Sequence, residues 1–189
     1  IEVPISIQSA ECPCTFPPKP KELTKPELSE ATVRSVIDEL IQAKRPLILA
    51  GQGIRLSNSV ELLERFISYL DLPVINSRMG IDTITSDSKY FVGRCGNHGY
   101  RSAHFAAQTC DSLLILGSHL APNTTGYNVQ DFSKQSHKTL VEIDPKELTK
   151  YGTPIDVTIE ADLHDFLSMA VGILEAEHLK GNHSHWVSV

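Results

Sequence analysis

Long apolar runs are missing from this sequence, and so is the pattern of a secretory signal. No stretch reaches the roughly 18 apolar residues that a membrane-spanning helix needs. Residues 1–10 lack the basic start and apolar middle of a signal peptide. We therefore predict no membrane association and a cytoplasmic location.

Clustered positive charge is missing as well. The 17 basic side chains are dispersed among 23 acidic ones, for a net charge of −6. A nucleic-acid surface needs basic residues gathered on one face, because they must neutralise phosphates together. The composition therefore excludes nucleic acid as an expected partner.

Cysteine is scarce, and the common catalytic signatures are absent. Cys12, Cys14, Cys95 and Cys110 have neither the spacing of a disulfide framework nor the CxxC spacing of a zinc site. The chain contains no GxxxxGK[ST] loop and no GxSxG elbow. We expect no metal site and no catalytic nucleophile in this chain.

Short apolar runs that end at Gly or Asp are what the sequence does have. They alternate with helical stripes, which is typical of a parallel sheet whose carboxyl edge opens into loops. The predicted fold is α/β, a doubly wound Rossmann-like six-stranded parallel sheet with helices on both faces. The strand order 3-2-1-4-5-6 places a crevice between the first and fourth strands. The predicted strands lie within 46–53, 72–80, 90–92, 113–116, 139–143 and 155–159, and the main helices within 28–43, 57–70, 102–109 and 163–174.

Several smaller elements are predicted with the fold. Pro26 and Ser29 are the start signals of the first of these helices, and Ser57 or Asn58 caps the second. A weak helix is expected at 129–132, and a short helical turn begins at Asp144-Pro145.

The two ends differ in character from the middle. Residues 1–8 alternate apolar and polar side chains, as in the last strand of an upstream unit. Residues 11–27 contain five prolines and read as an extended linker, and residues 179–189 have the polar character of another linker. We expect a central domain, residues 28–178, taken from a longer protein.

Two glycine loops are expected to face one another across the crevice. Gly51-Gln52-Gly53 follows the first strand, and Gly117-Ser118-His119 follows the fourth. Glycine lets the backbone approach a ligand closely, although the dinucleotide fingerprint GxGxxG is incomplete here. A plain strand-to-helix turn remains the alternative interpretation. His98 draws attention because glycines flank it in GNHG.

Residues 45–66 and 72–120, followed by TGYN and LVEIDPKEL, carry a resemblance that covers residues 40–165. They resemble the central domain of thiamine-diphosphate-dependent enzymes, in the acetolactate synthase-like group. Residues 1–10 resemble the end of that family's pyrimidine-binding domain. The resemblance implies a homo-oligomeric parent enzyme that acts on 2-keto acids by decarboxylation and carboligation, with thiamine diphosphate and magnesium held by domains outside this chain. Residues 179–189 would then lead to the missing C-terminal domain, and this chain alone would catalyse nothing.

The same resemblance implies a site for FAD or ADP in the crevice, and the family also has members whose crevice is empty and whose central domain is architectural. The chain departs from the flavin-binding pattern where His119 replaces an arginine and Asn97 replaces a methionine. Arg78, Arg94 and Arg101 are alternative sources of charge for a phosphate. The cofactor-binding positions implied are Gly51, Gln52, Gly53, Gly96, Asn97, His98, Gly99, Gly117, Ser118, His119, Asp144 and Asp162.

Overall fold

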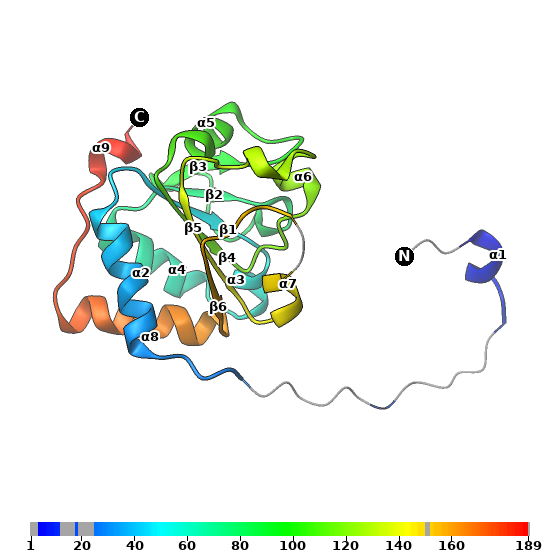
Figure 1. Cartoon of the computed structure of the whole chain (residues 1–189), viewed down its shortest axis with the longest axis horizontal. Helices are drawn as coiled ribbons and strands as arrows, with labels where there is room; N and C mark the ends of the chain where they lie inside the picture. The colour runs from blue at the N-terminus through cyan, green and yellow to red at the C-terminus, as the bar shows by residue number, and fades with distance from the viewer. Residues whose placement is uncertain (1–3, 12–17, 19–24, 150–151, 189) are drawn as a thin grey trace.

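The sheet confirms the predicted topology. The structure is a computed structural model that describes residues 4–11, 18, 25–149 and 152–188. All strand pairs are parallel, and the order β3-β2-β1-β4-β5-β6 is the one expected from the sequence (Figure 1). The strands are β1 (Pro46–Ala50), β2 (Val74–Asn76), β3 (Phe91–Arg94), β4 (Ser112–Leu116), β5 (His137–Glu142) and β6 (Val157–Glu160).

Helices connect the strands, as right-handed crossovers require. No helix in the described ranges is long and apolar enough to cross a bilayer. The α-helices are α1 (Ile5–Gln8), α2 (Glu30–Gln42), α3 (Gly53–Leu56), α4 (Val60–Leu70), α5 (Arg101–Thr109), α6 (Pro122–Thr125), α7 (Pro145–Thr149), α8 (Leu163–Ala176) and α9 (Ser184–Val187), and the 3₁₀ turns are η1 (Arg78–Gly80) and η2 (Val129–Asp131).

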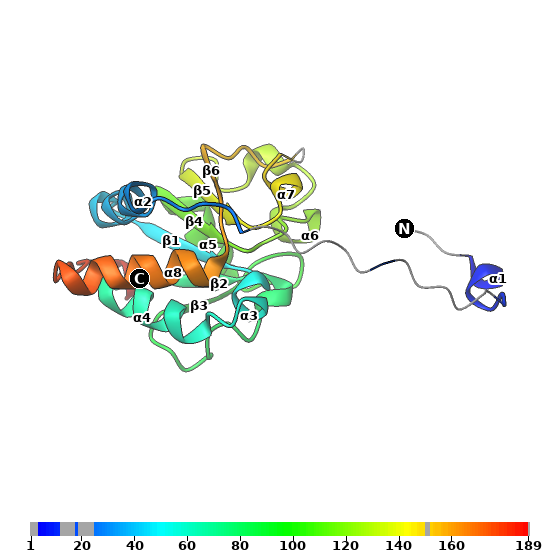
Figure 2. The same ribbon diagram turned by 90° about the horizontal axis from the view of Figure 1, so that it is seen from below.

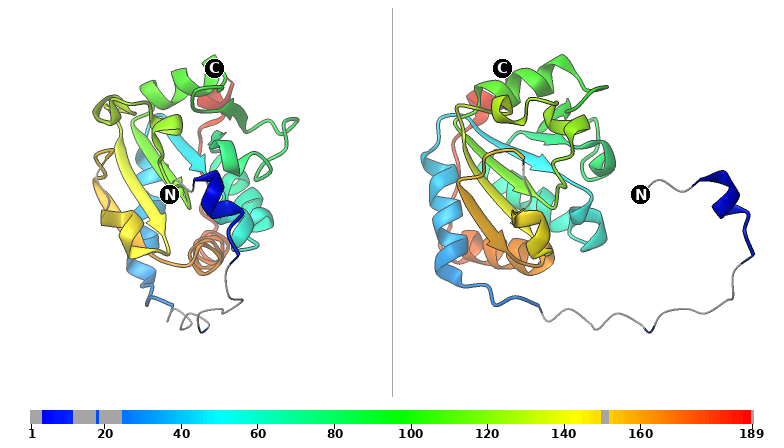
Figure 3. Two further views of the ribbon diagram at one scale, coloured as in Figure 1. Left: turned by 90° about the vertical axis from the view of Figure 1, so that its right-hand side faces the viewer. Right: turned by 45° about the vertical axis from the view of Figure 1, so that its right-hand side comes forward.

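Helices cover both faces of the sheet. Alternate side chains of β1 point to opposite sides, so Ile48 packs in one core and Leu47 in the other. The core that contains Ile48 is closed by α2, α4 and α8, and the second core by α5 with Trp186 of α9. Figure 2 shows α2, α4 and α8 gathered together, and Figure 3 shows the orange α8 across the sheet from the green α5.

The carboxyl edge of the sheet carries the loops that matter for binding. The register pairs Ala50 of β1 with Leu116 of β4, so both strands end side by side. Strand order reverses at this pair, which is where open α/β sheets form a crevice. The candidate site therefore lies beyond β1 and β4 and extends toward β2 and β5.

The start of α4 differs from the prediction. Neither Ser57 nor Asn58 caps it, because the one-turn helix α3 occupies residues 53–56 and Ser57 ends that turn. Asn58 then adopts a positive φ of 55°, a conformation that Asn tolerates better than most residues, and Ser59 becomes the N-cap of α4. The helix at 129–132 is the 3₁₀ turn η2.

The amino-terminal end of the described chain also differs from expectation. Residues 1–3 lie outside the described residues, and Ile5–Gln8 is a helical turn and not a strand; an unpaired strand would leave its backbone groups without partners, whereas a turn bonds them locally. Its residues are exposed, and it lies apart from the sheet (Figure 1). Residues 179–188 return to the domain, where the indole Nε1 of Trp186 donates to the Pro46 carbonyl at 2.9 Å.

Candidate functional site

The two glycine loops pack directly against each other. The amide of Gly53 donates to the Gly117 carbonyl at 3.0 Å. A Cβ atom on Gly51 would lie 2.1 Å from the Gly117 carbonyl oxygen, and Gly117 itself has a φ of +57°. These glycines are thus required by backbone packing between β1 and β4, a requirement that the sequence alone could not separate from ligand approach.

A hollow of about 300 Å³ opens beside this glycine contact, and we call it the β4 hollow. Gln52, Gly53, Gly117, Ser118 and His119 all line it, so most of the predicted loop residues do meet at one site. Gly51 is not in its wall. Its other lining residues are Leu56, Ser77, Arg78, Met79, Leu120, Ala121, Asn123, Thr124, Glu142 and Glu147.

Acidic groups dominate the β5 side of the β4 hollow. The Nδ1 atom of His119 lies 2.8 Å from a carboxylate oxygen of Glu147 on α7, and Glu142 at the end of β5 adds a second carboxylate. His119 therefore does not supply the free fixed charge that an arginine fork would give to a phosphate. Carboxylates at this end are suited to accept hydrogen bonds from ribose hydroxyls.

An adjoining hollow of about 310 Å³ continues along the same side. Ser118, Leu120 and Glu147 line both this hollow and the β4 hollow. Its wall also contains Thr153, whose buried hydroxyl oxygen has no hydrogen-bond partner in the described part of the chain. A buried hydroxyl without a partner is costly, so a ligand group able to bond it would be favoured here.

Basic groups gather at the opposite end, in a hollow of about 270 Å³ that we call the arginine hollow. Arg78, Arg94, Asn97, His98 and Asn123 line it together with Cys95. Arg78 also lines the β4 hollow and is exposed, with no ion pair or hydrogen bond of its side chain among the described residues. An unpartnered guanidinium at the centre of the site is available for a phosphate.

Arg78 is held in place by the backbone beneath it. The turn η1 places Arg78, because the Ser77 hydroxyl accepts from the amide of Gly80 at 3.2 Å and the Ser77 amide donates to Ala50 at 3.0 Å. Gly80 sits so close to β1 that a Cβ atom there would lie 2.5 Å from the Ala50 carbonyl oxygen. The arginine therefore projects from a turn clamped to β1.

The GNHG segment forms a folded loop around the arginine hollow. The amide of Asn97 donates to the Asn123 carbonyl at 2.9 Å, and Gly96, with a φ of +104°, leaves no space for a Cβ beside that carbonyl. The guanidinium of Arg94 donates to the His98 carbonyl at 3.2 Å. Asn97 and His98 thus line the hollow, while Gly99 packs on Arg94 and His104 and shapes the loop.

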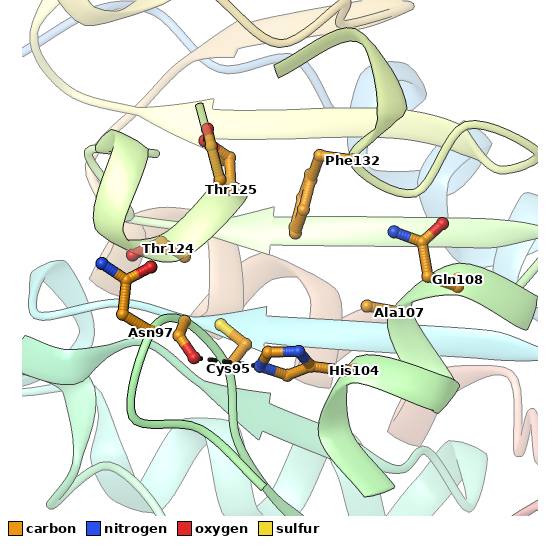
Figure 4. A pocket seen from close by; sticks show the side chains of 10 residues that line it. Cys95, Asn97, His104, Ala107, Gln108, Thr124, Thr125 and Phe132 are labelled. Carbon is orange, nitrogen blue, oxygen red and sulfur yellow. Dashed lines mark hydrogen bonds between the residues drawn. The ribbon is translucent and has the colours of Figure 1, made fainter. Parts of the chain in front are cut away.

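Behind this loop lies an inner hollow of about 220 Å³ (Figure 4). Cys95, Ala107 and Phe132 give it apolar walls, and Figure 4 shows His104 beside Cys95 on the side toward α5. The Nε2 atom of His104 lies 3.0 Å from the Gly96 carbonyl oxygen and ties α5 to the loop. Burial raises the pKa of the Cys95 thiol to about 12, so this thiol stays protonated and is a poor nucleophile.

Asp144 and Asp162 stand apart from these hollows. The carboxylate of Asp144 accepts from the Lys146 amide at 2.9 Å, at the start of α7. The carboxylate of Asp162 caps α8 by accepting from the His164 amide at 2.8 Å. Both aspartates have local helix-capping roles.

Glu142 and Glu147 are the acidic residues that line the site, and the sequence pattern does not single them out. Glu142 directly precedes Ile143, inside a run that is typical of a strand. Glu147 follows Asp144 by three residues, and this helical spacing on α7 was the available signal. In the described part of the chain, no three His, Cys, Asp or Glu side chains form a group able to hold a metal ion.

Comparison with known proteins adds independent information. The family model described as "Thiamine pyrophosphate enzyme, central domain" matches residues 33–170. A probable acetolactate synthase large subunit of Methanocaldococcus jannaschii is 27% identical over 186 residues, which are 95% of this chain and 31% of that protein. The acetolactate synthase isozyme 2 large subunit of Escherichia coli is 27% identical over 169 residues, 88% of this chain and 30% of that protein. The large subunit from Pyropia yezoensis is 31% identical over 134 residues, 71% of this chain and 22% of that protein. The chain thus spans less than a third of the length of these relatives.

Proposed function

We propose that this chain, which belongs to the thiamine pyrophosphate enzyme family as the central domain of an acetolactate synthase-like enzyme, binds an adenine nucleotide cofactor, FAD or ADP, along the carboxyl edge of its sheet. The row of hollows from Arg94 to Glu147, with the unpartnered Arg78 between its two ends, carries this proposal. A nucleotide has both a phosphate for the basic end and hydroxyl groups for the acidic end.

The residues present fit such a ligand in a specific orientation. Arg78 and Arg94 face the arginine hollow and would hold the phosphates, with donors from Asn97 and Asn123 beside them. Glu142 and Glu147 would accept from ribose hydroxyls at the other end. In this orientation the phosphates do not lie against the loop after β4, because His119 in that loop is already paired with Glu147.

In the whole enzyme the domain would orient the nucleotide and leave the chemistry to other parts. FAD, when bound, supplies a redox-active ring, whereas ADP supplies none. The parent enzyme would decarboxylate and join 2-keto acids, with thiamine diphosphate and magnesium held by its other domains and its subunits assembled as a homo-oligomer in the cytoplasm. The role of this domain would be to bind, orient and shield the nucleotide.

An architectural role is the second candidate, and the glycine contact favours it. Gly51, Gly53 and Gly117 are explained by backbone packing alone, and Asp144 and Asp162 by helix capping. In that case the domain would space the catalytic domains and support subunit contacts.

Calorimetric titration of the 189-residue chain separates the two candidates. FAD and ADP are titrated at near-physiological salt, with thiamine diphosphate as the control compound. Saturable binding of FAD or ADP, with no binding of the thiamine compound, supports the nucleotide site. No binding of either nucleotide supports the architectural role, and equal binding of all three indicates only unspecific attraction of phosphates.

A further inference from the structure

A second hollow with a different character lies at the amino edge of the sheet, away from the nucleotide crevice. It has a volume of about 640 Å³ and opens between the segment that enters β1 and residues 180–186. We call it the basic hollow, because its charged wall residues are Lys44, Arg45 and Lys180, together with His183 and His185. No carboxylate lines it, although the chain as a whole carries a net charge of −6.

The walls of the basic hollow are fixed to the body of the domain. The amide of Gly181 donates to the Tyr69 carbonyl at 3.0 Å, and a Cβ atom on Gly181 would lie 2.1 Å from the Leu70 carbonyl oxygen. The indole of Trp186 is bonded to Pro46 at the start of β1. The hollow is therefore a built feature, formed where residues 180–186 pack against the entry to β1.

The two lysines of the hollow have no direct partner within the described part of the chain. In the described residues, the ammonium groups of Lys44 and Lys180 make no ion pair and no hydrogen bond. The nearby Asp111 carboxylate keeps its negative charge, but its oxygens accept from the backbone amides of Lys44 at 3.0 Å and Arg45 at 2.8 Å and form no ion pair with the lysines. The guanidinium of Arg45 gives only its Nε to the Thr109 carbonyl.

A buried imidazole in the wall adds a second, independent observation. His183 is only 6% exposed, and its Nε2 atom has no hydrogen-bond partner in the part of the chain that is described. Burial lowers the pKa of His183, so the ring is neutral near pH 7. A buried nitrogen without a partner is unfavourable, and in the tautomer that carries its proton on Nε2 the ring can donate to a bound anion, which removes that penalty.

We propose that the basic hollow binds a small phosphate-bearing anion, separate from the nucleotide crevice. Lysine ammonium groups are point charges that approach a tetrahedral group from several directions, which suits phosphate. The volume falls in the range of small-molecule sites and leaves room for more than one phosphate group, or for an ester whose organic part lies against Trp186. The bound anion joins residues 180–186 to the β1 entry and so stabilises their contact.

Trp186 provides a direct readout, because it is the only tryptophan of the chain and lines the hollow. Its fluorescence is followed while inorganic phosphate or pyrophosphate is added to the whole chain, with ionic strength held constant by NaCl. The expected result is a saturable change in emission. A change that NaCl alone reproduces, or no saturable change with either anion, overturns the proposal.

Charge variants locate the anion within the molecule. Lys44→Glu and Lys180→Glu are expected to weaken binding by about tenfold each, as for the loss of one charge-assisted hydrogen bond. Lys134→Glu is the matched control, since Lys134 is an exposed lysine outside the hollow. If the control weakens binding equally, the effect is one of net charge and the site is rejected.

Three further variants keep the test decisive. Lys44→Gln and Lys180→Gln remove one charge without reversing it, and each must weaken binding in a chain that unfolds at the wild-type temperature. Arg78→Ala must leave the Trp186 response unchanged, because Arg78 lies at the opposite edge of the sheet. A Trp186 response that disappears with Arg78→Ala would place the anion in the crevice and contradict the proposal.

Discussion

The glycines and the arginines at the carboxyl edge of the sheet have different roles in its two halves. At β1 and β4, Gly51, Gly53 and Gly117 fill the space between the strand ends with backbone. At β2 and β3, Arg78 and Arg94 surround an open hollow, and Arg78 has no partner among the described residues. Glycine after a strand can therefore be a packing requirement, whereas an unpaired cation at a hollow is the stronger indication of a ligand.

Gly51→Ala tests the glycine packing between β1 and β4 and should have the largest effect. Its Cβ atom would lie 2.1 Å from the Gly117 carbonyl oxygen, so the two strand ends must move apart. We expect the free energy of unfolding to fall by about 3 kcal/mol, as for severe overpacking. Urea unfolding measures the change.

Gly172→Ala is the control for that variant. A Cβ atom at Gly172, inside α8, meets nothing within 4 Å, so the change should raise stability by about 0.5–1 kcal/mol through helix propensity. If Gly51→Ala proves as stable as wild type, the glycine loop is not closely packed and is open to a ligand after all.

Arg78→Ala tests the arginine hollow beside β2 and β3. Loss of one charge-assisted hydrogen bond to a phosphate should weaken ADP binding by about tenfold, measured by calorimetry. Stability should change by less than about 0.5 kcal/mol, because the side chain is exposed and unpaired. Arg101→Ala is the matched control, since Arg101 lies nearby on α5 but lines neither hollow. Equal losses from both arginines would refute a localised phosphate site.

The Cys95 thiol tests whether water reaches the wall of the arginine hollow that it forms. Burial raises the pKa of its thiol from 9.0 to about 12, so between these values the folded state holds a proton that the unfolded state releases. Stability is therefore complete below about pH 9 and falls as the pH rises through this window. At about pH 10 the loss should reach roughly 1 kcal/mol.

Cys95→Ala isolates this contribution from that of other groups. The stability difference between wild type and variant is measured by urea unfolding at about pH 8 and again at about pH 10. Between these two pH values the wild type should lose roughly 1 kcal/mol of its free energy of unfolding relative to the variant. A difference that stays constant would mean that water reaches the thiol.

His119→Glu tests the acidic end of the site and should have the smallest effect on ADP binding. The variant places a third carboxylate beside Glu142 and Glu147, and we expect about threefold weaker ADP binding, as for an exposed charge pair. Unchanged ADP affinity in His119→Glu would remove the loop after β4 from the site.

The apolar pattern predicted the sheet well, because β1, β2, β4 and most of β5 are buried runs, although the edge strands β3 and β6 are largely half-buried or exposed. The crevice location followed from the order of those strands. The one-turn helices α3 and α6 escaped prediction, since four residues are too few to show a helical period. Residues 179–188 read as linker by composition, yet Trp186 and His183 anchor them to the domain.

The candidate site was predicted less completely than the fold. Sequence spacing brought Gln52, Gly53, Ser118 and His119 to one hollow, as expected. It could not reveal that Asp144 and Asp162 would be used as helix caps, because a cap and a ligand contact have the same residue type. The pairing of His119 with Glu147 depends on how α7 packs, which no local pattern encodes.

A residue-resolved ¹H–¹⁵N spectrum of the chain, recorded while ADP is added, tests most directly whether the phosphates lie at Arg78. We expect saturable shifts in the amides of residues 78–79, 94–98 and 123–124, with Gly51 little affected. Shifts confined to residues 51–53 and 117–119, or no saturable shift at all, would contradict a phosphate site centred on Arg78.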